Sequence, residues 1–249
     1  MYDAEGNPYI EHLYDATVYD LTNREVTDGG CARTDVYVAK EVDITNYFEG
    51  QTSAQITSMV QRWYDQKRNV TEYIHYGDTT HNDEFFKAEI TYASGMSYNL
   101  ASLPSQIIVK NYSDATLQRR TATYDSRGKL IQLVRYNNSS ANAQYDFTYD
   151  TCGNLSHVIL PANANGQRIE YRYQYDSVVH TYPILVENMS LGYQSSARYD
   201  FMYGKPTQTV DINGNTMTYI YDAAGRNTVI LAPYEIDSGR PYTIKMEYY

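Results

Sequence analysis

The sequence predicts an all-β protein made of repeated antiparallel β-hairpins, with one short helix. Three observations lead to this prediction. The 249 residues include 29 Tyr against 5 Phe and 1 Trp. Aromatic residues alternate with polar ones over several short segments, and Asp-x-x-Gly turns recur in the second half of the chain. Tyr favours strands and keeps a polar tip, so many tyrosines indicate sheet faces that are only half buried.

The repeat is clearest in five Tyr-Asp pairs. They begin at Tyr124, Tyr149, Tyr175, Tyr199 and Tyr221, and their spacings are 25, 26, 24 and 22 residues. An internal period in this range is typical of repeat architectures, and each period holds about two strands with their turns.

The residues around these pairs predict strands that end in hairpin turns. Aromatic residues alternate in the sets Tyr145/Phe147/Tyr149, Tyr171/Tyr173/Tyr175 and Tyr199/Phe201/Tyr203, which places each set on one face of a strand. Asp at the first turn position accepts a backbone N–H, and Gly three residues later takes the left-handed conformation. The predicted structural turn residues are Tyr124, Asp125, Gly128, Tyr149, Asp150, Gly153, Asp211, Gly214, Tyr221, Asp222, Gly225 and Arg226.

The region before the repeats, residues 1–115, is less regular. Alternation predicts strands over 36–44 and 85–93. Between them, apolar residues with helical spacing, from Ile56 to Tyr64, and a capping-box pattern at Thr52 and Gln55 predict an amphipathic helix near 52–67. Residues 116–249 form the hairpin array. We expect one continuous structural unit, cut from a much larger protein.

Charge and motifs argue against several classes of function. Residues 1–100 contain 17 Asp+Glu against 7 Lys+Arg, and no basic stripe for nucleic acid is present. No apolar run is long enough for a membrane-spanning helix. We expect no cofactor, no metal site and no enzymatic activity, because no zinc, calcium or nucleophile-elbow motif is complete. Cys31 and Cys152 are interpreted as two unrelated thiols, although the sequence does not determine whether they pair.

These residues resemble a known family. The stretches "TYIYDAAGRNTVILAP", "YDSRGKLIQLVRY", "YDTCGNLSHVILP" and "VDINGNTMTYIYDAAGR" are similar to the YD repeats of Rhs proteins, which include the B-component middle region of bacterial insecticidal toxin complexes and, more distantly, teneurins. The resemblance covers about residues 121–249.

The resemblance implies a role in a wall. Rhs proteins wind a curved, spiralling sheet into a hollow β-shell that encloses a C-terminal toxin or effector and helps to deliver it. The implied partners are the rest of the parent polypeptide and an encapsulated C-terminal domain. The parent would be a secreted or cell-surface bacterial protein. The fragment shows no signal peptide and does not identify the cargo.

An alternative function rests on the tyrosines. Exposed rings can stack on sugar faces, and YD repeats are linked to carbohydrate binding by resemblance. A carbohydrate-binding or adhesion module is therefore the second hypothesis. Its ligand-facing residues would be Tyr171, Tyr173, Tyr175, Tyr199 and Tyr203.

Overall fold

The computed structural model describes residues 6, 8–20, 36–81, 83–95, 100–136 and 142–249. Within these residues the chain contains seventeen β-strands and one short helix, so the all-β class is confirmed. The chain divides into two compact units, Met1–Ala143 and Gln144–Tyr249, which are described separately.

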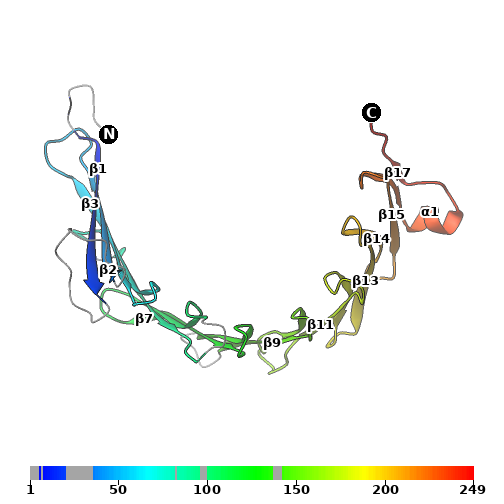
Figure 1. Ribbon diagram of the computed structural model, residues 1–249, viewed down its shortest axis with the longest axis horizontal. Coiled ribbons are helices and arrows are strands. Elements are labelled where there is room, and N and C mark those ends of the chain that lie inside the picture. The colour runs from blue at the N-terminus through cyan, green and yellow to red at the C-terminus, as the bar shows by residue number, and fades with distance from the viewer. Residues whose placement is uncertain (1–5, 7, 21–35, 82, 96–99, 137–141) are drawn as a thin grey trace. The chain divides into compact units, whose positions relative to one another are not determined.

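Unit 1 is an antiparallel meander in which each strand pairs with the next along the chain. Figure 1 shows these strands in blue to green. The strands are β1 (Ile10–Asp20), β2 (Val36–Tyr47), β3 (Ile56–Tyr64), β4 (Val70–Asp78), β5 (Phe86–Tyr92), β6 (Pro104–Lys110), β7 (Thr116–Tyr124) and β8 (Leu130–Tyr136).

Unit 2 continues the same pattern from β9 to β17, again with antiparallel pairing between successive strands. Its one described helix, α1 (Pro233–Ser238), comes between the last two strands along the chain. The strands are β9 (Ala143–Tyr149), β10 (Leu155–Ile159), β11 (Glu170–Tyr175), β12 (Pro183–Asn188), β13 (Tyr193–Asp200), β14 (Lys205–Val210), β15 (Thr216–Tyr221), β16 (Asn227–Leu231) and β17 (Ile244–Lys245).

Each unit is a single sheet layer. Among the described residues the buried hydrophobic side chains are Tyr37, Ala39, Ile74 and Val134, all in unit 1. Most strand residues are half-buried on both faces. Stable sheets normally bury one face against another layer, so these faces are ones that a further layer or a partner would cover.

The helix predicted near 52–67 is wrong, because Ile56–Tyr64 forms strand β3 between β2 and β4. In this single layer both faces are partly apolar, so apolar residues do not alternate strictly and can mimic helical spacing. The β-branched and aromatic residues of this segment favour the strand. The helix of the structure, α1, lies elsewhere.

One predicted aromatic stripe is also corrected. Strand β13 ends at Asp200, so Phe201 and Tyr203 lie in the following turn and not on a strand face with Tyr199. The other two stripes lie within β9 and β11. Cys31 lies outside the described residues, and Cys152 is exposed in a turn.

None of the helices in the described part of the chain has the length and apolar character needed to cross a membrane.

Candidate functional site

The recurring feature of both units is a hairpin turn fixed by one side chain. At Asp222, carboxylate Oδ1 accepts hydrogen bonds from the backbone N–H groups of Ala224 (2.9 Å) and Arg226 (2.8 Å). The N–H of Gly225 donates to the Asp222 carbonyl, and Gly225 has φ +74°. This is a type I turn followed by a left-handed residue. We call such a turn a YD corner when a strand-ending Tyr precedes the Asp.

The Arg226 side chain makes two contacts beyond the backbone hydrogen bonds of the turn. Its Nε donates to Asp222 Oδ2 at 2.8 Å, and its guanidinium lies 4.5 Å from the ring centre of Tyr248. The backbone N–H of Arg226 lowers the pKa of Asp222, and hydrogen bonding from the Arg226 side chain adds to this, although burial opposes it.

The other predicted turn residues adopt the same geometry. Asp125, Asp150 and Asp211 each accept from the backbone N–H four residues on, and Gly128, Gly153 and Gly214 have positive φ. Asp125 and Asp150 follow Tyr124 and Tyr149 and are YD corners. Asp211 turns the chain at the opposite ends of the strands, between β14 and β15.

Asp176, which has no turn Gly, forms the most extensive corner. Asp176 is 3% exposed, and its carboxylate accepts hydrogen bonds from five successive backbone N–H groups. Burial raises the pKa of this carboxyl, but the hydrogen bonds outweigh that effect and hold it well below its usual range. The donors are Val178, Val179, His180, Thr181 and Tyr182.

Sequence reasoning missed three further corners. Asp65, Asn111 and Asn163 each accept from the backbone N–H four residues on. In the first two turns a residue other than Gly takes the left-handed position, Arg68 with φ +66° and Asp114 with φ +60°. The signal at Asp65 was available, because Tyr64–Asp65 is itself a Tyr-Asp pair within the segment predicted as helix.

Neighbouring corners in unit 2 lock together through aromatic rings. The ring of Tyr182 stacks on Tyr199 with centroids 4.9 Å apart, and a Cβ added at Gly204 would lie 2.5 Å from the Tyr182 hydroxyl. One corner further on, a Cβ at Gly225 would lie 2.6 Å from the Tyr203 ring. Tyr203 also donates its hydroxyl to the carbonyl of Ala223 at 2.7 Å. Each glycine therefore leaves room for the aromatic ring of the preceding corner.

The strand-ending tyrosines link one hairpin to the hairpin before it. We call each such hydrogen bond a tyrosine bridge: the hydroxyl at the end of one hairpin's first strand donates to a backbone carbonyl in the second strand of the previous hairpin. The donor–acceptor pairs are Tyr92–Val70 (2.8 Å), Tyr124–Pro104 (2.9 Å), Tyr175–Leu155 (3.1 Å) and Tyr221–Pro206 (2.7 Å).

Each of these tyrosines lies beside a β-bulge. The pairing of Tyr124 with Leu130 and of Thr123 with Gln132 leaves one extra residue on the return strand. The same shift occurs next to Tyr92, Tyr175 and Tyr221. Bulges redirect side chains. Here they accompany tyrosine rings that reach the start of the adjacent strand, which belongs to the previous hairpin. Burial raises the pKa of all four bridging tyrosines.

The five tyrosines predicted to face a ligand lie in different settings. Tyr171 and Tyr173 are half-buried in β11. Tyr175 makes a tyrosine bridge, Tyr199 stacks on Tyr182, and Tyr203 lies against Gly225. Tyr175, Tyr199 and Tyr203 therefore contact other residues of the chain.

A tyrosine with a strongly raised pKa, Tyr64, belongs to a polar network in unit 1. Burial and a hydrogen bond to Glu41 raise the pKa of Tyr64 to about 12, and Tyr14 also donates to Glu41. A general acid or base works best with a pKa near neutrality, so the raised pKa of Tyr64 is unfavourable for general acid–base catalysis. In the described ranges, His, Cys, Asp and Glu side chains form no group of three that could hold a metal ion.

Comparison with solved structures identifies the fold. Over 91% of its length the chain superposes on a chain of the TcdB2-TccC3-Cdc42 crystal structure, with a TM-score of 0.62 and 11% sequence identity. The crystal structure of TcdB2-TccC3 without its hypervariable C-terminal region matches over the same share, with a TM-score of 0.60. The chain has the fold of one part of TcdB2-TccC3. The predicted resemblance to the YD-repeat region of toxin complexes is therefore confirmed for the fold.

The match covers 15% of the TcdB2-TccC3 chain in both structures, so our chain spans a small part of that fold. No protein-family model matches the sequence, and no curated protein sequence matches it. The likeness to TcdB2-TccC3 is thus carried by the arrangement of hairpins and not by sequence identity.

Proposed function

We propose that the chain is a wall segment of a YD-repeat shell that encloses a C-terminal toxin or effector and helps to deliver it. The observation that supports this most directly is the match of 91% of the chain to 15% of the TcdB2-TccC3 fold. A wall segment contributes structure and no chemistry, so we assign it no enzymatic activity. Its partners would be the remainder of its parent polypeptide and the enclosed domain, in a secreted or cell-surface protein.

The local geometry is consistent with such a role. A wall must be thin, extended and stiff, and each unit is one layer of strands. Within each unit, tyrosine bridges and contacts between corners join neighbouring hairpins, and these would supply the stiffness that a second layer otherwise gives. Repeat arrays of this kind are held together by contacts between neighbours.

The test uses the full open reading frame that contains this segment. Electron cryomicroscopy of the purified parent protein should show a hollow particle with β1–β17 in its wall. Protease treatment should leave the polypeptide inside intact until the shell is unfolded. A parent protein in which this segment forms a separate compact domain, or in which the downstream polypeptide is cleaved at once, would contradict the proposal.

Carbohydrate binding remains a prediction from the sequence. Three of its five candidate tyrosines contact the protein itself, and no observation of the structure favours a sugar site over sheet packing.

A further inference from the structure

One basic residue of unit 2 has no partner in the structure. Unit 2 contains seven Lys and Arg residues, and all of them lie in the described part of the chain. Within the described residues, Arg198 makes no ion pair, no side-chain hydrogen bond and no contact with an aromatic ring, and it is exposed near the end of β13. The other six each make at least one such contact: Arg168, Arg172, Lys205, Arg226, Arg240 and Lys245.

Arg198 lies on a groove of about 500 Å³. The lining includes apolar side chains from two neighbouring corners, Val178 and Phe201, and from strands β12 and β14, Ile184 and Val210. Val178 is 67% exposed and Phe201 is 41% exposed. The groove therefore places an exposed positive charge beside apolar side chains, and its volume lies in the range of sites for small organic ligands.

The polar end of the groove lies on one face of the sheet. Arg198 is the direct cross-strand partner of Gln208, and Ser196 is the partner of Val210. Paired residues, and residues two apart on a strand, share a face. Ser196, Arg198 and Gln208 therefore present a hydroxyl, a guanidinium and an amide together. In the described chain the Ser196 hydroxyl and the Gln208 amide have no hydrogen-bond partner.

Two acidic residues near the groove are held by their own turns. Asp176 lines the groove, but its carboxylate accepts from five backbone N–H groups. The Asp200 carboxylate accepts from the backbone N–H groups of Met202 and Tyr203. Neither carboxylate forms an ion pair with Arg198, so the guanidinium is available to an anion.

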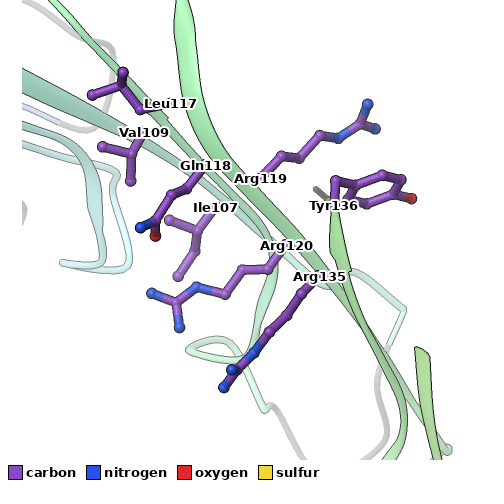
Figure 2. Close-up of a pocket in the computed structure, with 8 residues that line it drawn as sticks. All are labelled: Ile107, Val109, Leu117, Gln118, Arg119, Arg120, Arg135 and Tyr136. Atoms are coloured by element: carbon purple, nitrogen blue, oxygen red, sulfur yellow. The ribbon is translucent and has the colours of Figure 1, made fainter. Parts of the chain in front are cut away.

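An arginine beside apolar side chains is not always available in this way. Strands β6, β7 and β8 of unit 1 carry another groove, of about 480 Å³, which Figure 2 shows. There the guanidinium of Arg119 lies 4.6 Å from the ring centre of Tyr136. Arg198 makes no such ring contact, which distinguishes the groove of unit 2.

We propose that the groove of unit 2 binds a medium-chain aliphatic carboxylate such as decanoate. Arg198 and Gln208 would hold the carboxylate, and the alkyl chain would pack on Ile184, Phe201 and Val210. A guanidinium presents a planar fork that can donate two parallel hydrogen bonds to a carboxylate. The apolar lining favours a hydrocarbon chain, because each methylene removed from water contributes to binding.

A peptide suits this groove less well than an alkyl chain does. Strands β12, β13 and β14 pair with one another and use their backbone groups in that pairing. The backbone N–H groups of the Asp176 corner donate to its carboxylate. The amides of a bound peptide would therefore find few partners, and an unpaired buried amide is costly. An alkyl chain has no such groups.

Calorimetric titration of the 249-residue chain tests the proposal and does not depend on the shell role. Sodium decanoate, kept below the concentration at which it forms micelles, should bind at one saturable site. Octanoate should bind about five- to tenfold more weakly, because it has two fewer methylenes to bury. Decanol, which has a chain of the same length and no charge, should bind about tenfold more weakly than decanoate.

Single variants locate the two ends of the ligand. Arg198→Gln should weaken decanoate binding about tenfold and leave decanol binding unchanged, because only the charged contact is lost. Phe201→Ser should weaken the binding of both ligands. Val178→Ser, at a more exposed residue, provides the same test if Phe201→Ser does not fold. The control Arg240→Gln removes the same charge outside the groove and should bind decanoate like the wild-type chain. Circular dichroism establishes that each variant is folded.

Three outcomes would overturn the proposal. The wild-type chain shows no saturable binding of decanoate, Arg198→Gln binds decanoate as well as Arg240→Gln does, or an acetylated tri-leucine peptide with a free carboxyl terminus binds more tightly than decanoate. None of these outcomes depends on whether the parent protein forms a shell.

Discussion

At the scale of the residue, each corner depends on one side-chain oxygen and one left-handed residue. Asp and Asn both supply the oxygen, as Asp211 and Asn163 show. Gly supplies the left-handed position in most corners, yet Arg68 and Asp114 occupy it elsewhere. A positive φ costs a residue with a Cβ about 1–2 kcal/mol, which a corner can sustain when nothing else crowds the position.

A comparison of Gly225 with Gly214 distinguishes the cost of a positive φ from the cost of a steric clash. Both have positive φ, but a Cβ at Gly225 meets the Tyr203 ring whereas a Cβ at Gly214 has nothing within 4 Å. We expect Gly214→Ala to lower the free energy of unfolding by about 1 kcal/mol. Gly225→Ala should cost about 2–4 kcal/mol, because the ring must also move. Urea unfolding measures both, and equal losses in the two variants would show that the ring contact does not matter.

The corner aspartates predict a loss of stability in acid. Hydrogen bonds hold the pKa values of Asp150, Asp176, Asp211 and Asp222 below the value in the unfolded chain. A depressed pKa in the folded state stabilises the protein above the unfolded pKa of about 3.9, and that stabilisation is lost as pH falls below it.

We therefore expect the free energy of unfolding to fall between about pH 4 and pH 2. In Asp211→Asn the drop should be smaller, because Asn keeps the acceptor oxygen without a titrating carboxyl. An acid transition of unchanged size in the combined Asn variants of Asp150, Asp211 and Asp222 would contradict this assignment.

At the scale of the element, the hairpin is tied to its predecessor by the tyrosine that ends its first strand. This explains why Tyr and not Phe occupies these four positions, since the hydroxyl and not the ring alone makes the bridge. One neutral hydrogen bond contributes about 0.5–1.5 kcal/mol, and the chain gains it at each of the four bridges.

Removing a single hydroxyl tests the bridge. Tyr124→Phe should lower the free energy of unfolding by about 1 kcal/mol, because the Pro104 carbonyl loses its donor while the ring stays in place. The matched control is Tyr193→Phe, at a residue that is 53% exposed, and it should change stability by less than about 0.5 kcal/mol. The thermal unfolding curve of Tyr124→Phe should therefore lie at lower temperature than that of Tyr193→Phe. Coincident curves would argue against a stabilising bridge.

The same elements show what sequence patterns could and could not predict. Corners with both Asp and Gly, such as Asp125 to Gly128, have a local signature and were identified. The corner at Asp65 was not, because Arg68 replaces Gly and the preceding strand has apolar residues on both faces. The bridges have no signature at their acceptor ends, because Val70, Pro104 and Leu155 contribute only backbone carbonyls.

At the scale of the whole molecule, stability is a sum of contacts between neighbouring hairpins. In each unit the described strands contact mainly their neighbours in the sheet, and few side chains are fully buried, so a defect has little shared core through which to spread. Repeat proteins built this way open locally and not all at once.

Hydrogen exchange should show this locality. In Gly225→Ala we expect faster amide exchange in β14, β15 and β16, next to the altered corner, and unchanged exchange in β2, β3 and β4 of unit 1. A uniform increase across both units would indicate a single cooperative structure instead. Gly214→Ala provides a control in which the same strands should change less.

The interchangeable chemistry of the corners has an evolutionary consequence. A hairpin that needs only one acceptor oxygen, one left-handed residue and one hydroxyl places few demands on its other positions. Very different sequences can therefore form it, as the shared fold at 11% identity with part of a TcdB2-TccC3 chain illustrates. In such proteins we expect the interval between corners to be inherited more faithfully than the amino acids between them.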